Sequence, residues 1–393
     1  MKFDRYLQRT ARLDAEYENQ QNEEDQVKEI GSPLDKYLQS DRVMASDRFV
    51  FHRANPDVSF DEYRQNQRRT IRESIQAKRV IYLDTNAWKC LSDYERGKTK
   101  LIDAMVDFAK TMNSDRVRNN CVFPIGIATL FELQSMDDPV SLSTLTDLVE
   151  RFSMNIGYQP PNEIIDQELA LFNRKDTRDA CAEPERFCHP MEITGKLQAN
   201  VPNLLPAAET LAFKKTSLDI VHALPTAAHL ELAAASIHPQ WDNTAGIDEM
   251  NEGMVAHQHE LENFPDALLV ELTGIMKFHV PDGPPIGGYP PRRAQALMAM
   301  VHWHENPRSR HLMTARIQAN LHATVRHIEN RKFRKGDIAD FVTAEVALPS
   351  AHALFTDKAL ANLLNEPKIG LKQFCSCEVV SGFTNFAAYL KAV

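Results

Sequence analysis

Two acidic residues of this 393-residue sequence lie at the ends of short apolar runs. Asp84 follows the run Val80–Leu83 directly, and Asp357 follows Ala353–Phe355 with one residue, Thr356, between them. In α/β proteins, ligand-binding residues lie at or near the carboxyl ends of parallel strands. If both runs are strands of one sheet, the two carboxylates are expected at the same edge of it.

Two more acidic residues, Asp337 and Asp340, open a segment with a helical pattern that lies between Asp84 and Asp357 in the chain. Four carboxylates gathered at one edge would repel one another and take up protons unless cations neutralised them. Mg²⁺ or Mn²⁺ with all-oxygen coordination does so. Such ions can polarise a phosphate, generate hydroxide from bound water and stabilise the leaving oxygen. Hydrolysis of a phosphodiester bond needs these three effects.

Alternating strands and helices are predicted around these acids. A strand over 80–83, a helical pattern, a strand over 121–125 and a helix around 127–133 make the first βαβ unit. Near the C-terminus we expect a helix over 338–348, a strand over 353–355, a helix over 358–364 and a strand around 377–380. The fold class is therefore α/β, with a mostly parallel sheet between helices.

The chain divides into four regions: 1–75, 76–160, 161–330 and 331–393. The first is polar and predicts a helical N-terminal arm, and the second and fourth hold the two parts of the α/β core. The third is predicted to be a large, mostly helical insertion, with helical patterns over 204–212 and 226–235. A stretch rich in Pro and Gly, from 280 to 291, is predicted to be a loop within it.

The acids and their neighbours resemble the pattern of the PIN-domain nucleases. That pattern is a strand ending in Asp before Thr-Asn, a Glu-Leu pair on the second helix, an Asp opening the penultimate helix and a strand ending in Thr and Asp. Asp84, Glu132, Asp340 and Asp357 match these positions in order. The resemblance covers roughly 76–160 and 330–393, and it implies a PIN-like three-layer α/β/α core. The family commonly places its last Asp one residue further on and lacks so long an insertion.

The resemblance implies a role for each acid. Asp84 would be the central metal ligand, Asp340 and Asp357 would complete the Mg²⁺ or Mn²⁺ site, and Glu132 would bind a second ion or orient the water. Asp337, three positions before Asp340, is a further candidate ligand on an adjoining helix face. Residues expected to support the ligands or to contact the phosphate are Thr85, Asn86 and Thr356.

Each acid also has a purely structural interpretation. Asp84 and Asp357 precede predicted helices and are good N-caps. Glu132 can lie at the edge of a solvated helix face, and Asp337 can cap its own helix. Asp219 lies in a segment similar to that of Asp340, but no strand ending in Thr-Asp follows it, and we interpret it as structural.

The charge of the chain restricts how it can bind nucleic acid. A net charge of −9 and a pI of about 5.9 exclude coating by charge alone, so any such site must be local. Basic residues gather in 302–335, directly before the acidic helix. We predict that Arg331, Lys332, Arg334 and Lys335 contact the RNA backbone. A solvated helix face is the alternative.

Other classes of protein are disfavoured. The sequence has neither an apolar signal segment nor a stretch of ~18 uncharged apolar residues, which predicts a cytoplasmic protein without membrane spans. Its six cysteines do not indicate a disulfide framework. Zinc ligands could come from Cys181, Cys188 with His189, Cys375 and Cys377, but the C-x-x-C spacing is missing and reduced thiols are expected.

The predicted function is that of a divalent-metal-dependent endoribonuclease. A phosphatase of the haloacid dehalogenase type would need a second Asp two residues after Asp84, where this chain has Asn86. A structure-specific DNA nuclease of related fold and a non-catalytic PIN-like scaffold that binds nucleic acid remain as alternatives. Binding of an inhibitory protein and oligomerisation are left open by the sequence.

Overall fold

The computed structural model describes residues 39–134, 138–174, 183–193, 205–226, 228, 246–257, 261–328 and 331–393. Residues 1–38 of the predicted helical arm, most of the predicted helix over 226–235 and Cys181 lie outside the described residues. None of the described helices is long and apolar enough to cross a membrane.

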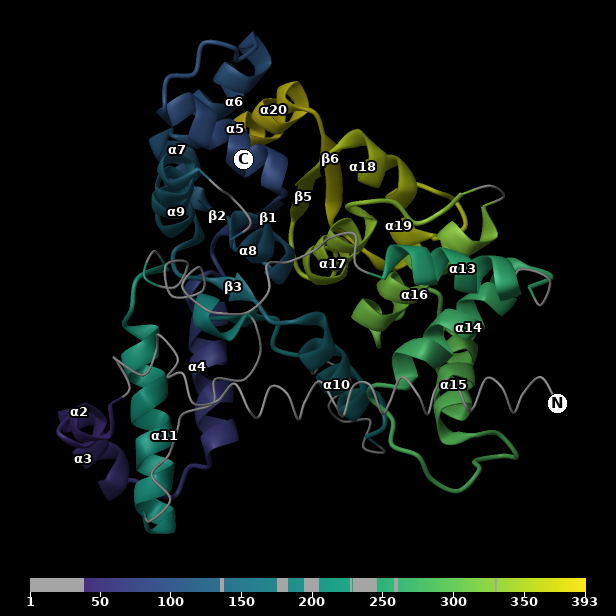
Figure 1. Cartoon of the computed structure of the whole chain (residues 1–393), viewed down its shortest axis with the longest axis horizontal. Coiled ribbons are helices and arrows are strands. Elements are labelled where there is room, and N and C mark those ends of the chain that lie inside the picture. Colours follow the sequence, from purple (N-terminus) through teal and green to yellow (C-terminus); the bar gives the residue numbers. More distant parts are fainter. Residues whose placement is uncertain are drawn as a thin grey trace.

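Four parallel strands form the central sheet, in the order β2-β1-β5-β6 (Figure 1). The strands are β1 (Arg79–Leu83), β2 (Cys121–Val122), β5 (Ala353–Thr356) and β6 (Glu378–Ser381). A second, antiparallel pair consists of β3 (Gly157–Tyr158) and β4 (Phe187–Cys188). A parallel bridge between Ile125 and Gly157 places β3 beside the chain that continues β2. The predicted α/β class with a parallel sheet is confirmed.

Helices cover both faces of the sheet, as the side chains of β1 show. Val80 and Tyr82 pack into one apolar cluster, and Ile81 and Leu83 pack into another on the opposite face. All four are at most 4% exposed. A strand buried on both faces needs a continuous apolar run, which is why 80–83 could be recognised as a strand.

The helices on the two faces come from both parts of the core. The face of Ile81 and Leu83 is covered by α5 (Thr85–Glu95), α6 (Asp103–Met112), α9 (Pro139–Ser153) and α20 (Phe383–Ala392). The face of Tyr82 is covered by α16 (Met313–His327), α17 (Asp337–Ala347), α18 (Lys358–Leu364) and α19 (Leu371–Phe374). The short helix α7 (Asp115–Asn120) leads into β2, and α8 (Ile127–Gln134) contacts α17.

The two strands that flank β1 come from different parts of the chain. After β1 it passes through α5, α6 and α7 to β2 on one side, and much later it forms β5 on the other side. The gap between β1 and β5 is therefore the topological switch point of the sheet. In open α/β sheets, ligands bind outside the carboxyl ends of the strands at this point.

The described part of 161–330 is mostly helical, as predicted. Its helices are α10 (Pro161–Phe172), α11 (Ala207–His222), α13 (Ile247–His257), α14 (Phe264–Met276), α15 (Pro291–Glu305) and α16. The last four lie together on one side of the molecule (Figure 1). Strand β4 and the 3-10 turn η4 (Pro190–Glu192) were not predicted, whereas the predicted loop does end at Pro291, where α15 begins.

The described arm consists of α2 (Ser40–Met44), α3 (Asp47–Ala54) and α4 (Phe60–Ser74). Buried ion pairs anchor α4, because Arg64 and Arg68 donate to the fully buried Glu192 at 2.9 and 2.6 Å. Asp219 of α11 accepts a hydrogen bond from Tyr63 at 2.6 Å and contacts His52 at 3.1 Å. Asp219 thus holds the arm to α11, in agreement with its structural interpretation.

Candidate carboxylate site at the switch point

Asp84 and Asp357 lie side by side at the carboxyl ends of β1 and β5. The backbone N–H of Asp84 donates to the carbonyl of Phe355 at 3.0 Å and so continues the pairing of the two strands. Both residues are also helix N-caps. The Oδ1 atoms of Asp84 and Asp357 accept from the N–H groups of Ala87 and Leu360, at 3.1 and 2.9 Å. Capping engages one oxygen of each carboxylate.

Asp340, in the first turn of α17, lies within the field of the other acids. Burial and then the negative charges of its neighbours raise the pKa of its carboxyl to about 7. In order of influence, these neighbours are Asp357, Asp84, Asp337 and Glu132. Coulombic interactions weaken with distance, so the structure brings the four predicted acids into one neighbourhood.

Asp84 has its own local partners. Burial, and to a lesser degree the charge of Asp357, raises the pKa of Asp84 to about 6. The hydroxyl of Thr356 and the backbone N–H of Asn86 donate to its carboxylate and act in the opposite direction. Thr356 is 2% exposed, so its hydroxyl fixes the carboxylate from within the protein. The side chain of Asn86 is exposed and Thr85 is half-buried, both at the first turn of α5.

The hydroxyl of Tyr82 ties together the two helices that bear Glu132 and Asp340. This fully buried group contacts the hydroxyl of Thr129 on α8 at 3.0 Å and hydrogen-bonds that of Thr343 on α17. Thr129 lies three positions before Glu132, and Thr343 lies three positions after Asp340. One strand residue therefore fixes both helices about one turn away from their acids.

The sequence did not reveal these positioning residues. Tyr82 carries the polar atom of an otherwise apolar run, and this was the available signal. Gly126 offers another, because a Cβ atom there would lie 2.7 Å from the Tyr82 hydroxyl oxygen. Only a glycine lets the chain before α8 pass so close to the tyrosine.

Asp337 has partners within the protein for its carboxylate. Its carboxylate pairs with the guanidinium of Arg331 at 3.0 and 3.2 Å and accepts the backbone N–H of Arg334 at 2.8 Å. These bonds occupy the carboxylate of Asp337 and hold the guanidinium of Arg331 against it. Arg334, Lys332 and Lys335 are exposed just before α17.

The four acids lie near one another but do not surround a common position for a metal ion. In the part of the chain that the structure describes, no three His, Cys, Asp or Glu side chains are arranged so that they could hold a metal ion. The donor set nevertheless suits a hard cation, since it consists of carboxylates. Their mutual repulsion is the second cause, next to burial, of the raised pKa of Asp340. Cys188, Cys375 and Cys377 are free thiols, and burial raises their pKa values.

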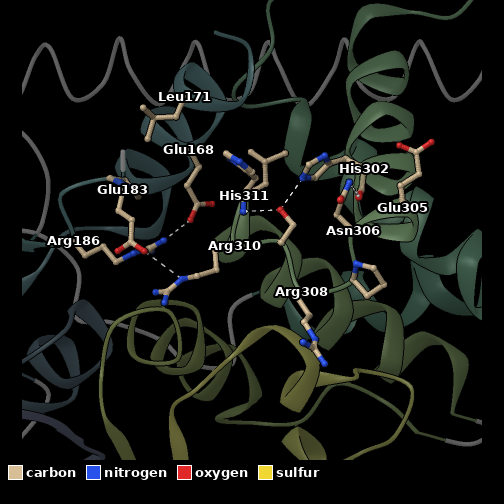
Figure 2. A pocket seen from close by; sticks show the side chains of 14 residues that line it. Glu168, Leu171, Glu183, Arg186, His302, Glu305, Asn306, Arg308, Arg310 and His311 are labelled. Atoms are coloured by element: carbon tan, nitrogen blue, oxygen red, sulfur yellow. Dashed lines mark hydrogen bonds and ion pairs between the residues drawn. The ribbon is translucent and has the colours of Figure 1, made fainter. Parts of the chain in front are cut away.

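Figure 2 shows a cavity of about 860 Å³, and none of the four acids is among its lining residues. Two of its arginines are paired with carboxylates, Arg186 with Glu168 at 2.8 Å and Arg310 with Glu183 at 3.3 Å. A neighbouring cavity shares Arg186 and Arg310 and reaches Arg79, the first residue of β1. These arginines thus lie toward the amino ends of the strands, at the edge opposite the carboxylates.

Comparison with known proteins leaves the family open. No family model, no curated protein and no solved structure matches this chain. Function is therefore inferred from the residues of the site and their geometry.

Proposed function

We propose that this chain is a divalent-metal-dependent endoribonuclease of the PIN type. The observation that carries the proposal is the convergence of Asp84, Glu132 and Asp357 on Asp340, outside the switch point of a parallel sheet. Capping alone accounts for Asp84 and Asp357 but gives no reason for Glu132 and Asp340 to join them on two further helices.

The arrangement of the core supports a PIN-like three-layer fold. The four acids come from β1, α8, α17 and β5, and these elements are distributed over both parts of the core, 76–160 and 331–393. Helices lie on both faces of the sheet, and a strand beside β2 extends it by a parallel bridge. The helical residues between the two parts fit an insertion that leaves this core intact.

Asp84, Asp340 and Asp357 would hold Mg²⁺ or Mn²⁺, and Glu132 would hold a second ion or orient the attacking water. Bound there, such an ion polarises the phosphate and lowers the pKa of water. The protein supplies the negative charge and its placement. Thr356 donates to Asp84 and would thereby help to hold its carboxylate in place.

The basic residues next to α17 would bring RNA to an otherwise acidic protein. Lys332, Arg334 and Lys335 are exposed in the segment that leads directly into the helix of Asp340. Contacts between such cations and phosphates release counterions and favour binding whatever the base sequence. They would hold the RNA backbone beside the carboxylates and take no part in the chemistry.

Cleavage of labelled single-stranded RNA and DNA by the full chain, with Mg²⁺, Mn²⁺ or excess chelator, tests the proposal. We expect RNA to be cut only when metal is present. Asp84→Asn should abolish cleavage and leave the circular dichroism spectrum unchanged, whereas Asp248→Asn, at an exposed position of α13, should cut as the wild type does.

The other outcomes separate the alternatives. Full activity in chelator would overturn a metal-dependent mechanism. Preferential cleavage of DNA would identify the structure-specific DNA nuclease. Binding of RNA without cleavage under any metal condition would identify the non-catalytic scaffold.

A further inference from the structure

The cavity of about 860 Å³ in Figure 2 lies between α10 and the loop 306–312, which joins α15 to α16. Sites for drug-sized ligands measure roughly 300 to 1,000 Å³, so this cavity has the size of a small-molecule site. Arg308 and Arg310 of the loop line it together with the rings of His302 and His311. Apolar surface comes from Leu171, Pro307 and Leu312. The lining therefore combines cations, aromatic rings and apolar groups.

Hydrogen bonds to its backbone hold this loop in place. The indole N–H of Trp303, on α15, donates to the carbonyl of His311 at 3.0 Å. The guanidinium of Arg316, on α16, donates to the carbonyl of Pro307 at 3.0 Å. Both donors are at most 9% exposed. A loop that is ordered before a ligand arrives loses less conformational entropy on binding, so its two arginines are positioned in advance.

Neither arginine of the loop is engaged by a strong partner. In the described part of the chain, Arg308 is exposed and has no ion pair. Glu305 also lines the cavity, but its carboxylate points away from Arg308 (Figure 2). Arg310 pairs with Glu183 at 3.3 Å, and the two side chains are 52% and 55% exposed. Exposed ion pairs contribute little free energy, so an anion can compete with Glu183 for Arg310.

The two histidine rings give the cavity an aromatic wall. Their centroids are 5.4 Å apart, and the ring of Phe172 lies 5.4 Å from that of His302. The Nε2 atom of His302 contacts the hydroxyl of Ser309 at 2.7 Å, which fixes the ring. Burial, and then the charge of His311, lowers the pKa of His302, so its ring is neutral at neutral pH. Unstacked bases bind against aromatic side chains, histidine included.

We propose that this cavity binds a nucleoside monophosphate, with its phosphate at Arg308 and Arg310 and its base against His302 and His311. The planar guanidinium group matches the oxygens of a phosphate, and two arginines on one ordered loop can share it. The same unit occurs as a free nucleotide and at the 5′ end of an RNA chain.

This site is separate from the carboxylates. Arg310 also lines the neighbouring cavity that reaches Arg79, the first residue of β1, whereas the carboxylates lie at the carboxyl ends of the strands. A phosphate bound by Arg310 is therefore not the one that would be cleaved. The proposal does not depend on the proposed ribonuclease activity.

The test is the binding of ligands to the full chain, measured by calorimetry in excess chelator. Adenosine 5′-monophosphate should bind most tightly. Adenosine, which lacks the phosphate, and ribose 5-phosphate, which lacks the base, should each bind about tenfold more weakly. Added salt should weaken the binding of the two phosphorylated ligands and leave that of adenosine nearly unchanged.

Two substitutions should change the affinity for adenosine 5′-monophosphate in opposite directions. Arg308→Gln removes a contact to the phosphate and should weaken binding by about tenfold. Glu183→Gln removes the anion that competes for Arg310 and should tighten binding by about threefold. The matched controls Arg116→Gln on α7 and Glu252→Gln on α13, both at exposed positions, should bind as the wild type does.

Failure of the wild type to bind adenosine 5′-monophosphate, unchanged affinity in Arg308→Gln, or equal affinities for this nucleotide and adenosine would overturn the proposal. So would weaker binding by Glu183→Gln. A 5′-phosphorylated RNA oligomer distinguishes the two sources of the ligand once nucleotide binding is established. If its affinity also falls in Arg308→Gln, the site accepts an RNA end, and if its affinity is unaffected, the ligand is the free nucleotide.

Discussion

Replacing Asp340 with Asn should stabilise the fold when no metal is present. The pKa of the Asp340 carboxyl is about 7, whereas its ordinary value is 3.8. At any pH above both pKa values, this shift destabilises the folded state by about 4 kcal/mol. Solvent that reaches this half-buried group screens part of the repulsion, so we expect about 2 kcal/mol. Asn keeps the shape of the side chain and removes its charge.

The sign of the pH dependence follows from the same pKa. The folded state holds the Asp340 proton more tightly than the unfolded state, so its destabilising effect is complete above about pH 7 and fades toward about pH 4. Urea unfolding in chelator should therefore show Asp340→Asn to be the more stable protein at about pH 8, by a margin that shrinks at about pH 5.

Metal should reverse this order. A cation that binds only the folded wild type stabilises it by about 3 kcal/mol at one hundred times its Kd, and the variant should gain much less from Mg²⁺. Asp337→Asn is the matched control, because it removes the partner of Arg331 and should lower stability at both pH values. If Asp340→Asn is less stable than the wild type in chelator at about pH 8, or gains as much from Mg²⁺, the reasoning is refuted.

Three further changes test the surroundings of the site. Tyr82→Phe leaves two threonine hydroxyls without their shared partner, and it should cost about 1–2 kcal/mol in urea unfolding and lower kcat for RNA cleavage more than it changes KM. Glu192→Gln removes the carboxylate that two buried arginines share, and it should cost about 3–5 kcal/mol, read from the urea midpoint. Replacing Lys332, Arg334 and Lys335 with Gln should weaken RNA binding for every sequence and flatten its dependence on salt.

Strands and strand ends were the most predictable part of the fold. The runs before Asp84 and Thr356 are apolar at every position because they are buried on both faces, and such runs are visible in a sequence. The strand expected over 121–125 ends earlier, at Val122. Beyond it, the N–H groups of Phe123 and Ile125 donate to the carbonyls of Phe152, at the end of α9, and Ile156, just before β3, rather than to β1. Exchange of one strand partner for another leaves no trace in hydrophobic periodicity.

Helix ends in the insertion were harder to predict. The helix expected over 204–212 is α11, which begins at Ala207 and continues to His222. Its extension carries Lys215, a residue type typical of exposed faces, yet this lysine is 1% exposed and donates to the carbonyl of Asn55 in the arm. Contact with a distant segment therefore overrode the local polarity pattern.

Of the candidate site, the sequence indicated the acids but not their partners. Asp84 and Asp357 could be located because each follows a recognisable strand. The pairing of Asp337 with Arg331 was missed because a nearby cation and a nearby carboxylate predict no particular geometry.

The capping bonds of Asp84 and Asp357 determine which substitutions can be interpreted. Alanine at either position would remove the charge and also the N-cap hydrogen bond of a helix. Loss of the N-cap lowers the free energy of unfolding by about 1 kcal/mol. Asparagine caps a helix about as well as aspartate does, so it changes the charge and spares the helix. At both strand ends, one aspartate both caps a helix and supplies a charge to the carboxylate site. Comparing asparagine with alanine at the same position separates the two effects.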